Sequence, residues 1–379
     1  MDDVLQADMK AAYAADRHEI DAAVRRVLES GWYILGAEVK AFESEFAAWC
    51  GVPHAIGVAN GTDAIQLALR AVGCGVGTSV VTVSHTVSAT VAAIEAIGAT
   101  PILIDVEPGS LTMDPHELNF VLEHPPVGLP PIRAVVPVHL YGQPAHMNDI
   151  SAQCRSHGVA LVDDCAHAHG AVIGDTKAGT WADASTFSFY PTKNLAGFGD
   201  GGMVTTGNAE LAESLRAMRQ YGWRFHYSSE SQGVDSRLDE LQAGMLRVRL
   251  RKLDGRLARR RAIAADYGDV LSSMDSDIVA PEERSGSLHA FHLYVVRSKD
   301  RDGLQTYLND RGVRTNIHYP QPVHLQPCYM DRVRLGPQRC VESERACKEI
   351  LTLPLHPEMT DGQVDRVCDA LRSYVAERG

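Results

Sequence analysis

The sequence predicts an α/β fold built on a mostly parallel β-sheet with helices on both faces. Three observations support this prediction. Short apolar runs of strand length alternate with longer segments of helical periodicity through the first half of the chain. These runs are nearly continuous, as is typical of strands buried on both faces. The chain has 379 residues, enough for about two domains.

The first half of the chain begins with two amphipathic helices and then alternates strand and helix. A Gly31–Gly36 segment containing Trp32 and Tyr33 separates the two helices, which span 16–30 and about 37–50. The expected strands are 54–59, 79–83, 101–105, 132–138 and 159–163, and the helices between them are 64–72, 87–97, 116–122 and 147–157.

The second half carries further strands at 170–173 and on both sides of Lys193, a helix over 210–221, and a polar loop over 227–234. A long charged helical segment over 238–267, interrupted near Asp254-Gly255, bridges to a second region. That region contains apolar strands within 290–296 and helices over 302–310, 343–350 and 361–376. We therefore expect a large domain over 1–250 and a smaller α+β domain over 251–379.

The turns after the predicted strands should meet at one edge of the sheet, because ligands of such sheets bind beyond the carboxyl ends of the strands. In the first turn, a helix opening on Thr62 offers free N–H groups and the positive end of its dipole to a phosphate. On these residues alone, a plain N-cap role for Thr62 is the preferred interpretation. The turns are Asn60-Gly61-Thr62, Ser84-His85-Thr86, His139-Leu140-Tyr141-Gly142 and Asp163-Asp164-Cys165.

Lys193 lies where an apolar run stops at Pro191 and a glycine-rich turn begins. Proline cannot continue a ladder, so the lysine is expected on a turn between two strands. Burial there lowers the pKa of the amine and suits it to Schiff-base chemistry. A surface-loop lysine fits the same stretch. The following glycines match Gly-x-Gly-x-x-Gly, but no strand precedes them and no helix follows, which excludes a dinucleotide site.

Composition excludes several classes of protein. The net charge of −12 argues against nucleic acid as a partner, and no apolar run is long enough to span a bilayer. The amino terminus lacks the basic start and apolar core of a signal peptide. None of the eight cysteines forms Cys-x-x-Cys, which favours reduced thiols in a cytoplasmic protein.

The segment from Asp163 to His169 contains two carboxylates, a thiol and two imidazoles, which suggests a metal site. Sequential aspartates at a strand end point to opposite faces, and no spacing matches a zinc site. We therefore expect no metal. A carboxylate at the ligand edge of the sheet fits a different role, as the partner of a pyridinium nitrogen.

The stretch Ser-Phe-Tyr-Pro-Thr-Lys-Asn, ending in Gly-Asp-Gly-Gly, resembles the cofactor-lysine segment of the DegT-type sugar aminotransferases. These are pyridoxal 5'-phosphate (PLP) enzymes of fold type I, the aspartate aminotransferase fold. Other segments resemble the family in the same order along the chain, at 161–169, 235–243 and 317–327. The resemblance implies a mostly parallel seven-stranded sheet in the large domain.

The resemblance also implies roles for individual residues. Lys193 would hold the cofactor and, once displaced, move a proton, while Asp164 would pair with the ring nitrogen. His167 stands where the family often has a glutamine near the ring hydroxyl. Many relatives have a stacking aromatic at the position of Val87, and His85 offers an alternative stacking partner. The implied phosphate ligands are Gly61, Thr62 and Ser188.

The segment Asp235 to Ala243 departs from the family pattern at its first residue. The family has an asparagine there that reaches the cofactor phosphate of the partner subunit, so the resemblance implies a homodimer with composite sites. A phosphate repels Asp235 unless the carboxyl is turned away or protonated. Arg237 could bind the phosphate instead. Asp235 could equally be the N-cap of a helix.

The implied reaction transfers an amino group, from L-glutamate, to a keto carbon of a nucleotide-linked deoxysugar. Tyr33, His318, Tyr319 and His324 are the expected substrate residues. Their segments favour C3 of a dTDP-linked 3-keto-6-deoxyhexose, as in amino-sugar and antibiotic biosynthesis. The alternatives are a C4 aminotransferase, a PLP-dependent sugar dehydratase and a non-catalytic regulatory relative. Lys193 argues against the dehydratase, because such relatives replace this lysine with histidine.

Overall fold

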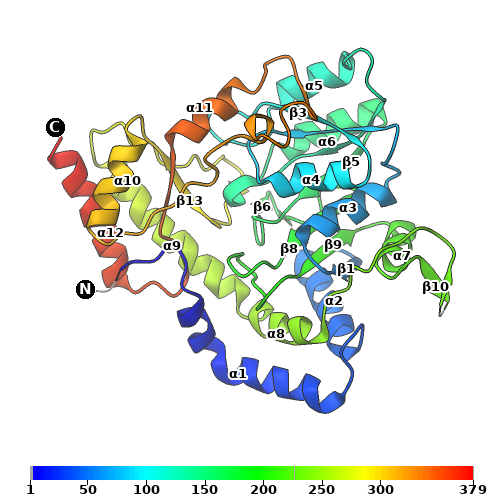
Figure 1. Ribbon diagram of the computed structural model, residues 1–379. Helices are drawn as coiled ribbons and strands as arrows, with labels where there is room; N and C mark the ends of the chain where they lie inside the picture. Colours follow the sequence, from blue (N-terminus) through cyan, green and yellow to red (C-terminus); the bar gives the residue numbers. More distant parts are fainter. Residues whose placement is uncertain (1–2, 226, 379) are drawn as a thin grey trace.

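An eight-stranded sheet forms the centre of the computed structural model, which describes residues 3–225 and 227–378 (Figure 1). Strand β9 is antiparallel to both of its neighbours and the other pairs are parallel, which confirms the predicted α/β fold. In spatial order, the strands are β1 (His54–Val58), β9 (Gly202–Thr206), β8 (Ala184–Ser188), β5 (Ala160–Asp164), β4 (Ile132–Val136), β2 (Ser79–Val83), β3 (Thr100–Ile104) and β14 (Arg334–Leu335).

Helices cover both faces of this sheet because alternate strand residues point to opposite sides. Val80 and Val136 pack with helices on one face, whereas their neighbours Val81 and Val135 pack with helices on the other. The first face is covered by α3 (Gly61–Ala71), α4 (Ser88–Ala96) and α7 (Ala209–Met218), and the second by α2 (Ala37–Cys50), α5 (Pro115–Glu123), α6 (Met147–His157) and α8 (Glu240–Leu250).

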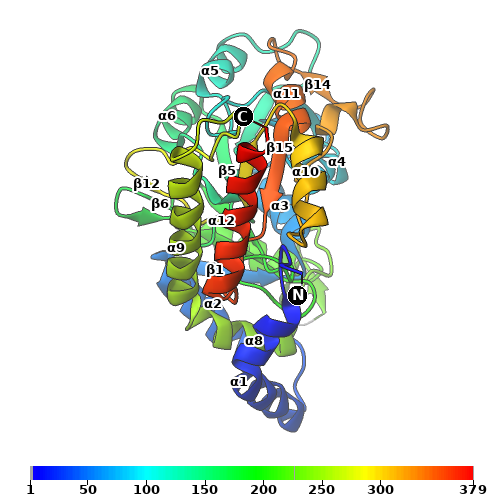
Figure 2. The same ribbon diagram turned by 90° about the vertical axis from the view of Figure 1, so that its left-hand side faces the viewer.

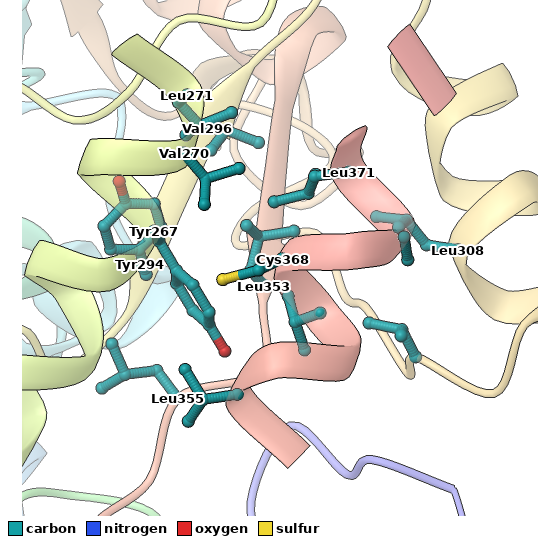
Figure 3. Packing of buried hydrophobic residues seen from close by; sticks show 14 of the residues in the cluster. Tyr267, Val270, Leu271, Tyr294, Val296, Leu308, Leu353, Leu355, Cys368 and Leu371 are labelled. Atoms are coloured by element: carbon teal, nitrogen blue, oxygen red, sulfur yellow. The ribbon is translucent and has the colours of Figure 1, made fainter. Parts of the chain in front are cut away.

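A separate hydrophobic cluster lies in the C-terminal part of the chain. It joins α9 (Leu253–Ser272), α10 (Arg301–Asp310) and α12 (Asp361–Ala376) to the antiparallel pair β13 (Tyr294–Arg297) and β15 (Ile350–Leu353). The three helices lie side by side in Figure 2. In Figure 3 their side chains point toward one another around Tyr267 and Tyr294, whose ring centroids are 5.2 Å apart. The division into domains at residue 250 stays a prediction.

Several predicted boundaries were wrong. Helix α1 (Met9–Ser30) begins earlier than expected, after Asp8, whose side chain accepts two backbone N–H bonds. The long charged helix breaks at 251–252, between α8 and α9, rather than at Asp254-Gly255. The predicted loop over 227–234 contains part of a small hairpin. The remaining strands and α-helix are β6 (Val172–Ile173), β7 (Thr176–Lys177), β10 (Trp223–Phe225), β11 (Ser228–Ser229), β12 (Ser287–Leu288) and α11 (Val341–Glu349), with short 3-10 helices at Leu140–Gly142 and Val323–Leu325.

The edge of the sheet at β3 is covered by the eighth strand, which the sequence did not predict. Only two residues of β14 pair with β3, opposite Ile102 and Leu103. Gly336 then donates its N–H to the carbonyl of Leu103 at 2.7 Å. Pro101 on the same edge strand has no N–H to offer. Within the part of the chain that the structure describes, no helix is long and apolar enough to cross a bilayer.

Candidate active site

A cavity of about 560 Å³ opens at the sheet edge, lined by two of the four predicted turns, 60–62 and 163–165. The carboxyl ends of β1, β5 and β8 meet there with the amino end of β9, since Gly202 pairs with both Val58 and Ser188. Nine of the predicted site residues line it. They are Gly61, Thr62, Val87, Asp164, His167, Ser188, Lys193, His318 and Tyr319.

Lys193 is half-buried on the turn that follows β8. Its backbone N–H donates to the carbonyl of Tyr190 at 2.8 Å, and the Asn194 side chain donates to the carbonyl of Ala290 at 2.9 Å. The glycines that follow Lys193 leave room for the Gln242 side chain, whose Oε1 accepts the N–H of Phe198 at 2.8 Å. Burial lowers the pKa of Lys193 to about 8, although Asp164 opposes the shift. With a pKa of about 8, about a tenth of the amine is unprotonated at pH 7, far more than for an ordinary lysine, which suits a nucleophilic amine.

Asp164 is held by two hydrogen bonds at the carboxyl end of β5. The Thr90 hydroxyl donates to Oδ2 and the backbone N–H of Ala166 donates to Oδ1, both at 3.0 Å. Burial raises the pKa of Asp164, while these donors and the nearby Lys193 favour the carboxylate. The carboxylate is therefore fixed in position and can accept a hydrogen bond from a protonated ring nitrogen.

Asp163 points to the other face of β5, as predicted. It belongs to a buried group with His139 and Cys165 whose potential ligand atoms lie within 4.8 Å of one another. His139 accepts the N–H of Ala145 on Nδ1 at 3.0 Å, so the proton of the neutral ring is on Nε2, which lies 3.2 Å from Asp163. Both ring nitrogens are thus engaged, and the arrangement is that of a hydrogen-bonded core cluster.

His167 lies at the side of the cavity with a defined tautomer. Its Nδ1 accepts the backbone N–H of Tyr141 at 3.1 Å, and burial together with Lys193 lowers its pKa well below the usual value. The neutral ring therefore carries its proton on Nε2. The ring centroid of His292 is 4.3 Å away. His167 is accordingly a hydrogen-bond donor, suited to an acceptor oxygen.

The amino terminus of α3 forms one end of the cavity. Asn60, not Thr62, is its N-cap, since Asn60 Oδ1 accepts the N–H of Asp63 at 2.8 Å. A Cβ on Gly61 would lie 2.7 Å from Cβ of Ser188, so glycine is required where α3 meets the end of β8. Backbone N–H groups at the start of the helix and the Ser188 hydroxyl thus stand together as an anion site.

Three residues considered for this cavity lie outside it. Tyr33 is about half exposed between α1 and α2. His324 is buried between Ser84 Oγ at 2.7 Å and Glu344 at 3.2 Å, which places its ring away from the cavity of its own chain. The proposal that His85 stacks on a cofactor was wrong, because its ring is buried against Tyr141 and Cys347.

Asp235 and Arg237 also lie outside this cavity and form an ion pair, with Arg237 Nε 2.8 Å from Asp235 Oδ1 and Nη2 2.8 Å from Oδ2. The Tyr221 hydroxyl donates to the same carboxylate at 2.7 Å. The N-cap interpretation of Asp235 was wrong, since α8 begins at Glu240 after Asp239. The carboxylate charge is therefore compensated within the chain.

Several residues that line or support the cavity were not predicted from the sequence. Thr90 holds Asp164 from the neighbouring helix α4, and its helical position gave no signal of that contact. His292 lines the cavity and interrupts an apolar run, which was a usable signal. Gln6 lines it because Val4 pairs with Val313 far along the chain. Asn316 also lines it.

Comparison with known proteins gives a consistent picture. The model of the DegT/DnrJ/EryC1/StrS aminotransferase family matches residues 14–372. The dTDP-3-amino-3,4,6-trideoxy-alpha-D-glucose transaminase of Streptomyces venezuelae is 44% identical over 372 residues, covering 98% of this chain and 96% of that protein. The dTDP-3-amino-3,6-dideoxy-alpha-D-galactopyranose transaminase of Aneurinibacillus thermoaerophilus is 40% identical over 367 residues, covering 97% and 98%.

The solved structures include a similar protein of the same fold. The crystal structure of S. venezuelae DesV in complex with a ketimine intermediate superposes with a TM-score of 0.94 and 42% sequence identity. The match covers 99% of each chain.

Proposed function

The chain belongs to the DegT/DnrJ/EryC1/StrS aminotransferase family, and from this premise we propose that it aminates C3 of a dTDP-linked 3-keto-6-deoxyhexose. The observation that carries the proposal is full-length similarity, at 40% and 44% identity, to two transaminases named for dTDP-3-amino sugars. We propose L-glutamate as the amino donor. The product would be a nucleotide-linked deoxyamino sugar, as used in antibiotic biosynthesis.

The cavity residues fit PLP, the cofactor of this family. Lys193 offers a buried amine for its covalent attachment, and Asp164 offers a fixed carboxylate for the ring nitrogen. The start of α3 and Ser188 suit its phosphate, and the Nε2 proton of His167 suits its ring hydroxyl. When bound, PLP supplies the electron sink that stabilises negative charge at the substrate carbon.

The chain's own residues supply the proton chemistry. With a pKa of about 8, Lys193 Nζ can both accept and return a proton near neutral pH, as proton transfer at the substrate carbon requires. Asp164 would keep the ring nitrogen protonated. His318 and Tyr319 line the cavity and are proposed to contact the sugar. His324 would act only indirectly, through Ser84.

We also propose a homodimer in which each subunit completes the site of the other. Lys193 is the only lysine or arginine among the described residues that line the cavity, too few for a cofactor phosphate and a sugar diphosphate together. Trp32 and Tyr33, in the loop between α1 and α2, are exposed at 64% and 48%. Such an aromatic surface is typical of an interface. Tyr33 would reach the sugar from the second copy.

Arg237 is expected to matter more for cofactor retention than Asp235. Arg237→Ala removes the cation proposed to reach the phosphate of the other subunit and leaves Asp235 with the Tyr221 hydroxyl but no compensating charge. Asp235→Ala removes the competing anion and leaves the cation free. Dialysis of both variants, followed by absorbance of the retained PLP, measures the effect. Equal retention, or a fully active monomer in sedimentation, contradicts the composite site.

The carbon that is aminated can be determined with the two keto isomers. Incubation with the 4-keto isomer alone is expected to give at most slow formation of a 4-amino sugar, and addition of a 3,4-ketoisomerase is expected to give the 3-amino product efficiently. The wrong isomer leaves a buried polar group unpaired, which costs about 1–3 kcal/mol, or about five- to 150-fold in kcat/KM. Reactions with the Lys193→Ala variant serve as blanks. Efficient formation of a 4-amino sugar without isomerase defeats the C3 assignment.

A further inference from the structure

Tyr141 is buried next to the cavity and contacts two of its wall residues by separate groups. Its backbone N–H donates to His167 Nδ1 at 3.1 Å, and its hydroxyl donates to the carbonyl of His318. Its own carbonyl accepts the N–H of Leu293, which also lines the cavity, at 3.2 Å. The backbone of Tyr141 is left-handed, with φ 60° and ψ −5°. One residue in an uncommon conformation thus connects three parts of the cavity wall.

The donor and acceptor roles around the hydroxyl are fixed by chemistry. A carbonyl can only accept, so the single hydroxyl proton points at His318. The Tyr141 oxygen must then accept from His85 Nε2, 2.9 Å away. With its proton on Nε2, neutral His85 presents Nδ1 as an acceptor to the Cys347 thiol at 3.5 Å. Burial favours this neutral ring, since it lowers the pKa of His85 to about 4.

The result is a one-directional chain of hydrogen bonds from α11 to the wall of the cavity. Its members Cys347, His85 and Tyr141 are all buried, with no more than 5% of each residue exposed. Water therefore has little access to replace a lost bond. His318 is also held by its side chain, where Nδ1 lies 2.9 Å from Thr352 Oγ1. The Tyr141 hydroxyl is the contact that fixes its backbone carbonyl.

We propose that Tyr141 is a positioning residue that holds His318 and the following Tyr319 in place for the sugar substrate. The inference rests on the proposed function only for the identity of that substrate. Tyr141 contacts neither Lys193 nor Asp164 in any hydrogen bond of the described residues, so cofactor attachment should not depend on its hydroxyl. The effect should therefore fall on sugar binding rather than on the reaction with the amino donor.

The test uses Tyr141→Phe, which keeps the ring and the backbone N–H bond to His167. The matched control is Cys347→Ala. It removes the thiol at the far end of the series of hydrogen bonds and leaves the Tyr141–His318 bond intact. We expect KM for the keto sugar to rise about tenfold in Tyr141→Phe, as for the loss of one buried hydrogen bond. The rate of the half-reaction with glutamate, followed by cofactor absorbance, should stay within about twofold. Both values should be near wild type in Cys347→Ala.

Hydrogen exchange of the cofactor-free proteins provides a readout that needs no substrate. Peptides covering 316–321 should exchange faster in Tyr141→Phe than in wild type or Cys347→Ala, with the rest of the sheet unchanged. Unchanged exchange there overturns the proposal, as does an equal loss in both half-reactions. If wild-type protein aminates no keto sugar while the exchange result holds, the proposed substrate is wrong and the positioning role of Tyr141 stands.

Discussion

Replacing Lys193 with alanine is expected to abolish transamination, with a loss of at least about 10³-fold in kcat. The variant loses both the amine that attaches PLP and the base that moves the proton, and the second role alone is worth about 10²–10⁴-fold. The lowered pKa of Lys193, to about 8, supports both roles. The purified variant should also lack the yellow colour of the covalently bound cofactor.

The attachment site can be mapped directly. Reduction of the wild-type holoenzyme with borohydride, followed by peptide mapping, should place the label on Lys193. Lys177→Ala is a matched control, because Lys177 lies on β7 with its Nζ 3.0 Å from the carbonyl of Trp49, away from the cavity. That variant should keep colour and activity. A label on any other lysine, or a yellow and active Lys193→Ala protein, overturns the assignment.

Asp164→Asn is expected to fold normally and to lose transamination by about a hundredfold or more. The amide is close in size to the carboxyl. Its single oxygen can still accept the N–H of Ala166, while its NH2 group can donate to the Thr90 hydroxyl. It carries no negative charge, however, and so cannot keep a proton on the ring nitrogen. Circular dichroism should show an unchanged fold, and steady-state kinetics should show the loss.

The adjacent aspartate provides the control for this variant. Asp163 lies on the same strand but faces His139 on the other side of the sheet. Asp163→Asn is expected to reduce the free energy of unfolding by about 1–3 kcal/mol, through the weakened buried bond, and to leave turnover largely intact. If Asp163→Asn were folded and inactive while Asp164→Asn turned over normally, the ring-nitrogen partner would be Asp163.

Much of the fold could be predicted because it depends on local patterns. The apolar runs that became β2 and β5, and the break at Pro191 before Lys193, are readable from neighbouring residues alone. The same rule that brings strand ends together placed Asp164 and Lys193 in one cavity. These predictions needed only strand direction and burial.

The errors concern contacts between residues far apart in the sequence. His85 follows a strand as a cofactor-stacking residue would, yet Cys347 and Tyr141 hold its ring elsewhere. The Ser84–His324 hydrogen bond, which places the His324 ring outside the cavity of its own chain, also joins distant residues. Thr90 was missed because nothing in its own helix shows that it reaches Asp164. Such long-range hydrogen bonds depend on how the elements pack together, and a single sequence does not show that packing.

The short strand β14 has a consequence for the solubility of the chain. An edge strand exposes N–H and C=O groups to which another molecule can add a strand, a common route to aggregation. Along β3, the 334–336 segment occupies the positions opposite Ile102 and Leu103, and Pro101 supplies no N–H next to them. The 334–336 segment and Pro101 thus protect the same edge, and the C-terminal region contributes to preventing strand addition to the central sheet.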